Sequence, residues 1–498
     1  MRHLPWIACA IVAVLAVGAL AGQQPASDAP VQSPAPESTR PSPRELLELF
    51  SIDDALFKSF VDDRPLEESE REKLVLLLHR LRQSPPGTME DFAVPVRVMR
   101  SIPPGPDEYR GEVFSVPGFV RYVAREELPA EMREKFQLDA WYRCEIVTFL
   151  GNQVTLYAAS IPRAWKLDAP LEERCDALAM FVKVLAPAAA GQGEADKLQD
   201  ADPVDRQPSF LVVAPRVAWH PNTMLGDLRM DVGLLDDVRD RTGLEERECF
   251  YQMLAAVTRA GEGRIERAAL AQLAERRDFL ERVARNRHQG AKARVAAERA
   301  LKRAAKNADD VVPLFNEPAA QRGRLFMLSG EALRAIEVRV SDPDIVKRFG
   351  IDHYFEVEIV TEDSQNNPIV CCLAALPPDM PLGESIHENV GVSGFFLKSW
   401  AFDAQKTSGL GAPGDSNRQQ LAPLLIGKTL RVIKPPSSAP QSPTLAVGIV
   451  VAILLGAAVM WQMRRAERRT LAKSDRTAAS LPERIAIDES PNAAGETA

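Results

Sequence analysis

Short apolar runs separated by polar, turn-rich stretches dominate the second half of the chain and predict β-strands. Five such runs cover residues 323–340, 354–361, 369–376, 390–402 and 424–433. The first run is interrupted by Gly330, which indicates a bend, and the second alternates so that Glu356 and Glu358 share one face. The pattern therefore predicts five strands, of which the first is bent at a glycine.

The same pattern occurs earlier in the chain, because two segments are copies of one unit. Residues 136–148, FQLDAWYRCEIVT, match residues 349–361, FGIDHYFEVEIVT, at six of 13 positions. Gly118 corresponds to Gly330 in the first predicted strand of each copy. A duplicated unit predicts the same order of strands in both copies.

The correspondence extends to both ends of the unit. Lys183 of the first copy corresponds to Lys398 of the second. A predicted helix precedes each copy, with LEESER at residues 66–71 and LEEREC at residues 244–249. Each copy is therefore expected to comprise a leading helical part and a small barrel.

An extra segment of strong helix formers lies between the leading helix and the barrel of the second copy. Residues 264–287 and 290–306 are rich in Ala, Glu, Arg, Leu and Lys and predict a helical hairpin. From residue 259 to 306 there are 14 Lys and Arg against six Asp and Glu. The candidate binding residues of this cationic arm are Arg276, Arg277, Arg282 and Arg285. Its predicted target is an acidic polymer or protein, and the alternative is a solvated helical pair.

These elements predict an α+β protein with two tandem five-stranded β-barrels. Helices precede each barrel, a helical hairpin is inserted before the second, and one transmembrane helix ends the fold. Five strands, a glycine-bent first strand and a connection between the third and fourth resemble the OB-fold. Another small Greek-key barrel or a sandwich is the alternative. The layout also resembles a family of bacterial envelope proteins, a resemblance that implies no function.

Apolar runs near both ends of the chain predict its place in the cell. Residues 6–20 follow Arg2 and His3, a layout typical of a secretory signal peptide, with an uncleaved anchor as the alternative. Residues 445–461 are apolar and uncharged, and Arg and Lys cluster at 464–473. The sequence therefore predicts a single-pass cell-membrane protein whose bulk is extracytoplasmic and whose C-terminal tail is cytoplasmic.

Small residues at a spacing of four mark one face of the predicted transmembrane helix. They are Gly448, Ala452 and Gly456. Small residues let helices approach closely in lipid, so this face predicts a homodimer. The alternative is that such residues are simply common in transmembrane helices.

The predicted organisation has nine segments. They are a signal peptide at 1–21, a linker rich in Pro, Ser and Ala at 22–44, a helical lead-in at 45–107, the first barrel at 108–220, a helical segment with the basic hairpin at 221–321, the second barrel at 322–434, a Pro/Ser linker at 435–443, the transmembrane helix at 444–463 and a cytoplasmic tail at 464–498.

Composition adds little to this picture. Apolar residues make up 46% of the chain and charged residues 26%, as in ordinary globular proteins, and the net charge of −8 indicates no particular partner. Five cysteines follow the predicted signal peptide, an odd number that argues against a disulfide framework. Cys144 and Cys175 form the one pair that the first copy offers for a bridge.

Aromatic residues on the predicted strands are the candidates for a stacking surface. Trp141 corresponds to Tyr354 in the other copy, and both are candidate binding residues. Binding of single-stranded nucleic acid needs exposed aromatics on a basic groove, whereas packing in the core is the alternative role. The export signal disfavours nucleic acid as a partner.

Sequence motifs for catalysis, metal binding or cofactor binding are not found. HExxH, CxxC, GxSxG, a Walker loop and GxGxxG after a strand all fail to occur, so no catalytic residue, metal or cofactor is predicted. His220, Asp227 and Asp231 cluster in a polar loop after the first barrel and could bind a cation, although their spacing does not select for one.

Three classes of function stay open. The favoured one is a membrane-anchored binding or scaffolding protein whose two barrels contact another envelope component, since two weak sites on one chain gain avidity. An envelope enzyme of unrecognised type would require a deep pocket with paired carboxylates in one copy only. A protein that binds oligosaccharide or oligonucleotide would require exposed aromatics on the strands of both copies.

Overall fold

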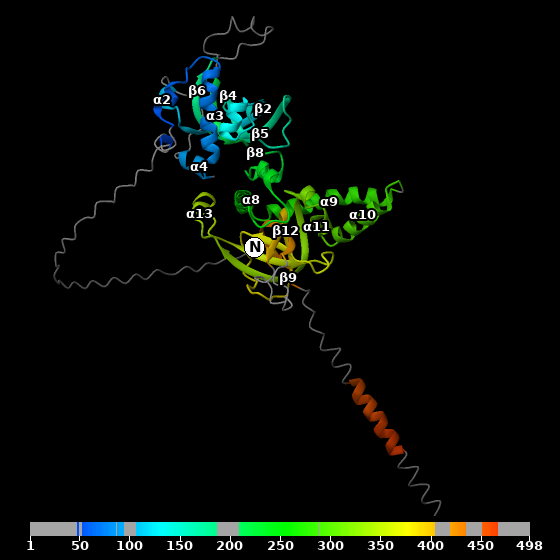
Figure 1. The fold of residues 1–498 in the computed structure, drawn as a ribbon. Helices are drawn as coiled ribbons and strands as arrows, with labels where there is room; N and C mark the ends of the chain where they lie inside the picture. The colour runs from blue at the N-terminus through cyan, green and yellow to red at the C-terminus, as the bar shows by residue number, and fades with distance from the viewer. Residues whose placement is uncertain are drawn as a thin grey trace, which may run out of the picture.

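The computed structural model describes residues 47–48, 52–85, 87–93, 106–186, 209–286, 288–403, 419–434 and 451–466. Within these residues the chain forms two β-sheet units, with helices before the first and between the two (Figure 1).

The first unit is a curled sheet of eight strands. They are β1 (Val113–Ser115), β2 (Gly118–Glu127), β3 (Ala140–Thr148), β4 (Gln153–Ser160), β5 (Pro170–Asp176), β6 (Leu178–Leu185), β7 (Ser209–Arg216) and β8 (Ala218–Trp219). Their order across the sheet is β1-β6-β7-β4-β3-β2-β5-β8. The prediction of a five-stranded barrel is therefore wrong for this unit.

The second unit is a closed barrel of five strands. They are β9 (Leu325–Arg339), β10 (His353–Val360), β11 (Ile369–Leu373), β12 (Glu388–Asp403) and β13 (Gln419–Val432). The order around the barrel is β10-β11-β13-β12-β9, with β11 and β13 parallel and the other pairs antiparallel.

Strand pairing nevertheless corresponds between the units. Val113 of β1 opposes Met180 of β6, as Leu325 of β9 opposes Phe395 of β12. The one parallel pair of the first sheet, β4 with β7, matches β11 with β13. The first unit has more strands because Pro117, which has no N–H to donate to a ladder, separates β1 from β2. A second break separates β5 from β6, and β8 adds an edge.

Helices surround the two sheets. Before and within the first unit lie α2 (Asp54–Lys58), α3 (Glu68–Gln83), α4 (Thr88–Phe92), the 3-10 helix η1 (Pro106–Glu108) and α5 (Ala130–Phe136). Between the sheets lie α7 (Met224–Asp227), the 3-10 helix η3 (Val232–Asp237), α8 (Arg247–Arg259), α9 (Arg264–Arg285), α10 (Ala291–Ala304), α11 (Val312–Asn316) and α12 (Pro318–Gln321). In the second barrel, α13 (Pro343–Phe349) connects β9 to β10.

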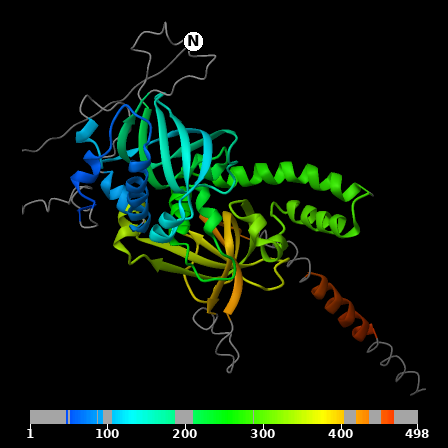
Figure 2. The same ribbon diagram turned by 45° about the horizontal axis from the view of Figure 1, so that its top comes forward.

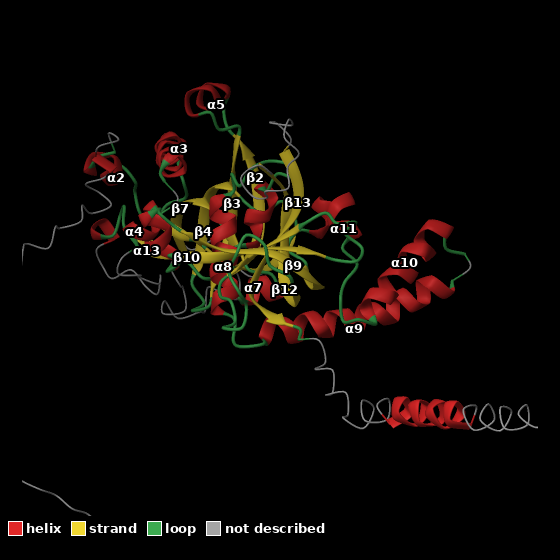
Figure 3. Cartoon of the chain, turned by 90° about the horizontal axis from the view of Figure 1, so that it is seen from below, coloured by secondary structure: helices red, strands yellow, loops and turns green. Residues whose placement is uncertain are grey.

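Corresponding helices cover corresponding strands. Helix α3 buries Leu74 and Leu78 in a core that it shares with β7, and α8 packs in the same way on β13. Helices α9 and α10 form a hairpin that projects from the second barrel (Figures 2 and 3).

Gly118 and Gly330 lie where two strands approach closely. A Cβ atom at Gly118 would lie 2.3 Å from the carbonyl oxygen of Val147, and one at Gly330 would lie 2.2 Å from that of Val360. Both positions therefore need glycine for the same physical reason.

A buried lysine ties the leading helix of each unit to its sheet. The Nζ atom of Lys183 on β6 donates to Glu70 of α3 at 2.7 Å, and that of Lys398 on β12 donates to Glu246 at 2.8 Å. Both lysines are fully buried. The duplication thus extends from the strands to individual charges in the core.

The structure contradicts the predicted transmembrane helix. Among the described residues, no helix combines the length and the apolar character that crossing a bilayer requires. Residues 451–466 are helical and exposed (Figure 1). The predictions of a single-pass anchor and a cell-membrane location are therefore wrong. Of the predicted homodimer face, Ala452 and Gly456 lie on this helix and Gly448 lies outside the described residues, and the homodimer stays a prediction. The predicted signal peptide and both linkers lie outside the described residues.

Candidate functional site

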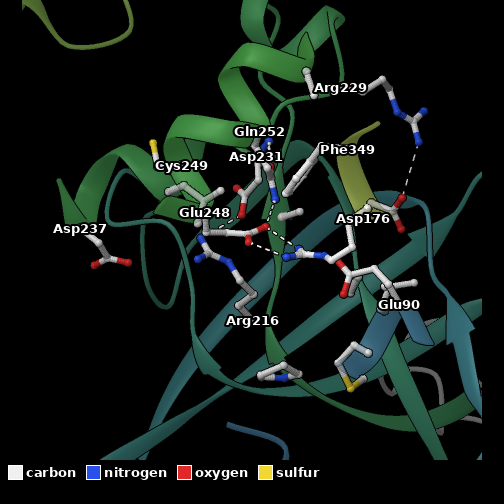
Figure 4. A pocket seen from close by; sticks show the side chains of 18 of the residues that line it. Glu90, Asp176, Arg216, Arg229, Asp231, Asp237, Glu248, Cys249, Gln252 and Phe349 are labelled. Atoms are coloured by element: carbon white, nitrogen blue, oxygen red, sulfur yellow. Dashed lines mark hydrogen bonds and ion pairs between the residues drawn. The ribbon is translucent and has the colours of Figure 1, made fainter. Parts of the chain in front are cut away.

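A cavity of about 630 Å³ lies between the two units (Figure 4). Its walls come from the end of α3, from α4, from strands β5 to β8, from residues 229–259 and from Arg348 and Phe349 of α13. Cavities of this size hold small ligands and commonly form at the junction between domains. The charged side chains that line it make it the candidate site.

Arg348 connects three elements at this cavity. Its Nη2 atom donates to Glu90 of α4 at 3.0 Å and to Glu248 of α8 at 2.7 Å, and its Nη1 atom donates to Glu248 at 2.9 Å. Burial raises the pKa of Glu90 and outweighs the opposing effect of Arg348. The guanidinium is itself buried, yet the hydrogen bond to Glu248 and the charge of Glu90 raise its pKa, so it stays a cation.

Asp231 forms a second fixed charge in the wall. Its Oδ1 atom accepts hydrogen bonds from the backbone amides of Trp219 and Gly233, both at 2.9 Å, and its Oδ2 atom pairs with Arg216 at 2.9 Å. The backbone amide of Asp231 donates to Gln252. Burial raises the pKa of this carboxyl group, although Arg216 and the amides oppose the rise.

His220 is the one histidine that lines the cavity. Its Nδ1 atom lies 2.9 Å from the carbonyl oxygen of Met230. Because a carbonyl only accepts hydrogen bonds, Nδ1 carries the proton. Burial lowers the pKa of His220, so the ring is neutral at pH 7 and Nε2 is a hydrogen-bond acceptor.

Arg229 and Arg259 are two cations of the cavity wall, and only Arg229 has a carboxylate as a described partner. Arg229 lies 3.6 Å from Asp176, and Arg259 donates to the carbonyl oxygen of Leu228 at 2.8 Å. No carboxylate in the described part of the chain pairs with Arg259. Burial lowers the pKa of Arg259, and the positive charge of Arg229 lowers it further. An anion placed between the two guanidinium groups would relieve this repulsion.

Arg229 also has an unusual backbone conformation. Its φ angle is +62°, in the left-handed region, which residues other than glycine adopt only at an energetic cost. Such positions are enriched at ligand sites, where the surrounding structure enforces them.

Activated nucleophiles do not line the cavity. Cys249 is buried, and burial raises the pKa of its thiol, which keeps it protonated. Cys144 and Cys175 are likewise free, buried thiols, so they form no bridge. In the part of the chain that the structure describes, no group of three side chains could hold a metal ion.

The aromatic candidates from the sequence lie in the core. Trp141 is fully buried, contacts the tilted ring of Tyr157 with ring centroids 4.3 Å apart and donates to Glu126. Tyr354 is buried beside Phe250 of α8. Neither ring presents a face on which a base or a sugar could stack.

The four candidate arginines lie on α9, away from the cavity. Three of them have partners nearby: Arg276 pairs with Asp309 at 3.0 Å, Arg285 with Glu281 at 3.1 Å, and Arg282 lies over the ring of Phe279 at 6.0 Å. Arg277 is exposed.

No motif or spacing in the sequence marks most residues of the cavity as functional. Two of them, His220 and Asp231, were singled out in the polar loop after the first copy. The third residue of that loop, Asp227, instead lies 3.4 Å from Arg174. Arg348 and Arg259 stand in ordinary helical contexts, so only the packing of the two units brings them together.

No protein-family model matches the sequence, and no curated protein is similar to it.

Proposed function

We propose that this protein is a binding protein that holds a small organic anion in the cavity between its two units. The observation that carries the proposal is the pair Arg229 and Arg259, two guanidinium groups at one cavity, of which only Arg229 pairs with a carboxylate of the described residues. Guanidinium groups bind carboxylate and phosphate groups through charge-assisted hydrogen bonds. His220 would accept a hydrogen bond from a donor elsewhere on the ligand.

The side chains of the cavity support binding in preference to catalysis. Three of the carboxylates that line it are held by arginines, since Glu90 and Glu248 share Arg348 and Asp231 pairs with Arg216. A pair of carboxylates at one cavity is the arrangement expected of an enzyme, but Glu90 and Glu248 already have Arg348 as a fixed cation between them. Fixed charges of this kind orient a ligand without supplying a nucleophile.

A screen of small carboxylates and phosphates against the full chain tests the proposal. Compounds that bind the folded protein raise its melting temperature, and isothermal titration calorimetry then gives their affinity. A charge-assisted hydrogen bond contributes about 1.5–3 kcal/mol, so Arg259→Met should weaken binding by about 10- to 100-fold.

Arg339→Met is the matched control, because the side chain of Arg339 is exposed and lies outside the cavity. It should bind the same compound with unchanged affinity. The proposal fails if no anion raises the melting temperature, or if Arg259→Met and Arg339→Met bind it equally well.

A further inference from the structure

One turn has a different amino-acid composition in the two units, although the strands that it connects pair in the same way. It follows Thr148 at the end of β3 and Thr361 after β10, two threonines at corresponding positions. The next two residues are Phe149 and Leu150 in the first unit but Glu362 and Asp363 in the second. The same backbone feature is thus apolar in one unit and acidic in the other.

Helix α10 lies against the acidic turn. Arg303 donates to Glu362 at 3.3 Å and lies 3.5 Å from Asp363, while Lys306 donates to Glu362 at 2.5 Å. The carboxylate of Asp363 is buried and also accepts a hydrogen bond from the backbone amide of Val311. The second unit therefore carries its own helical hairpin for this turn.

The apolar turn of the first unit is open. Phe149 is 53% exposed and Leu150 is 50% exposed. The ring of Phe149 contacts that of Phe119 at 5.4 Å, and Arg121 lies over Phe119. Exposed large apolar side chains that gather in one place mark interaction surfaces. We call these three apolar residues, Phe119, Phe149 and Leu150, the open turn.

The outer part of the hairpin, residues 277–286 and 288–298, also exposes apolar side chains. Phe279 on α9 is 56% exposed and Val295 on α10 is 61% exposed. This part of the hairpin projects from the body of the molecule (Figures 2 and 3). Its base is fixed by the pair of Arg276 and Asp309, so the exposed end is presented on a rigid support.

Charge favours a second copy of the same chain as the partner of the hairpin. Residues 259–306 carry an excess of eight positive charges. Residues 45–186, which include the open turn, hold 25 Asp and Glu against 18 Lys and Arg, an excess of seven negative charges. Opposite charges of similar size speed association and favour this pairing over contact between like segments.

We propose that the outer part of the hairpin of one copy docks on the open turn of another, with Phe279 and Val295 against Phe149 and Leu150. Within one molecule the base of the hairpin holds the acidic turn through Arg303 and Lys306, whereas the contact between molecules would use the apolar side chains of the outer part. It uses different surfaces on the two partners, so each copy offers one hairpin and one open turn.

Sedimentation velocity of the full chain tests the proposal. A small contact of this kind gives weak association, so the average mass should rise about twofold between about 1 and 100 µM. A turn variant, Phe149→Glu with Leu150→Ser, and a hairpin variant, Phe279→Glu with Val295→Ser, should each stay monomeric. All four positions are exposed, so both variants should keep the melting temperature of the wild type.

Mixing the two variants separates this contact from other kinds of association. The turn variant keeps an intact hairpin and the hairpin variant keeps an intact turn, so an equimolar mixture should form pairs and nothing larger. Leu382→Glu, which changes a similarly exposed apolar residue elsewhere, should associate like the wild type. A wild type that stays monomeric over this range, or a mixture in which no pairs form, would overturn the proposal.

Discussion

The fully buried Lys183 and Lys398 show how single charges hold each helix to its sheet. A buried ammonium group is tolerated only when a carboxylate pairs with it, and Glu70 and Glu246 do so. Burial alone would raise the pKa of Glu70, but the hydrogen bonds from Lys183 and from two backbone amides prevail and lower it. The pKa of Glu246 is lowered for the same reasons.

We expect Lys183→Met to lower the free energy of unfolding by about 3–5 kcal/mol at pH 7, because it leaves the carboxylate of Glu70 buried without a cation. The double variant Glu70→Gln with Lys183→Met should recover much of this loss. Lys135→Met is the matched control, since the pair of Lys135 with Glu72 is exposed and is worth at most about 1 kcal/mol. Urea unfolding measures all three, and an equal loss in Lys183→Met and Lys135→Met would contradict the expectation.

The lowered pKa values of Glu70 and Glu246 also set a pH dependence. A carboxyl group whose pKa is lower in the folded state stabilises the protein at pH values above 4.5, the ordinary pKa of Glu. This contribution disappears as the pH falls through the pKa of the folded state. Urea unfolding between pH 6 and 3 should show the wild type losing more stability than the double variant does. Parallel curves would show that Glu70 contributes nothing to acid sensitivity.

At the scale of the elements, the sequence predicted the strands that consist of apolar runs or contain a bend glycine. The duplicated segments gave the pairing shared by β3 and β10, and the bend glycines gave the close approach at Gly118 and Gly330. The division of the first sheet was not predicted, because breaks at single residues such as Pro117 leave the apolar pattern unchanged. The edge strand β8 is two residues long, too short for any periodicity.

We expect Gly118→Ala and Gly330→Ala each to destabilise the protein by about 1–3 kcal/mol, because the added methyl group would overlap a carbonyl oxygen of the neighbouring strand. Gly290→Ala is the control, since a Cβ at Gly290 meets nothing within 4 Å. Thermal unfolding should show lower melting temperatures for the first two variants only. An unchanged melting temperature in Gly118→Ala would mean that the strands can separate without cost.

At the scale of the whole molecule, the position of α13 determines the cavity. Arg348 contacts α4 from the first unit and α8 from the segment between the units, and Lys347 pairs with Asp91 nearby. This site could not be predicted, because its residues come from segments up to 258 positions apart. Periodicity and local motifs describe neighbours in sequence and carry no information on how two finished units pack.

We expect Arg348→Met to lower the free energy of unfolding by about 3 kcal/mol, because Glu90 and Glu248 would lose their shared cation. Hydrogen exchange should also speed up in α4 and α13, which this residue links. Lys347→Met breaks only an exposed pair and should cost less than about 1 kcal/mol. Equal effects of the two substitutions would show that Arg348 does not link the units.

The two LEE segments use corresponding acids for different contacts. Glu248 is the copy of Glu70, yet Lys398 takes its carboxylate from Glu246, two residues earlier. Glu248 is therefore not needed to neutralise the buried lysine, and it binds Arg348, whose own counterpart, Lys135, lies exposed in the first unit. The same position of the leading helix thus serves the core in the first unit and the junction between the units in the second.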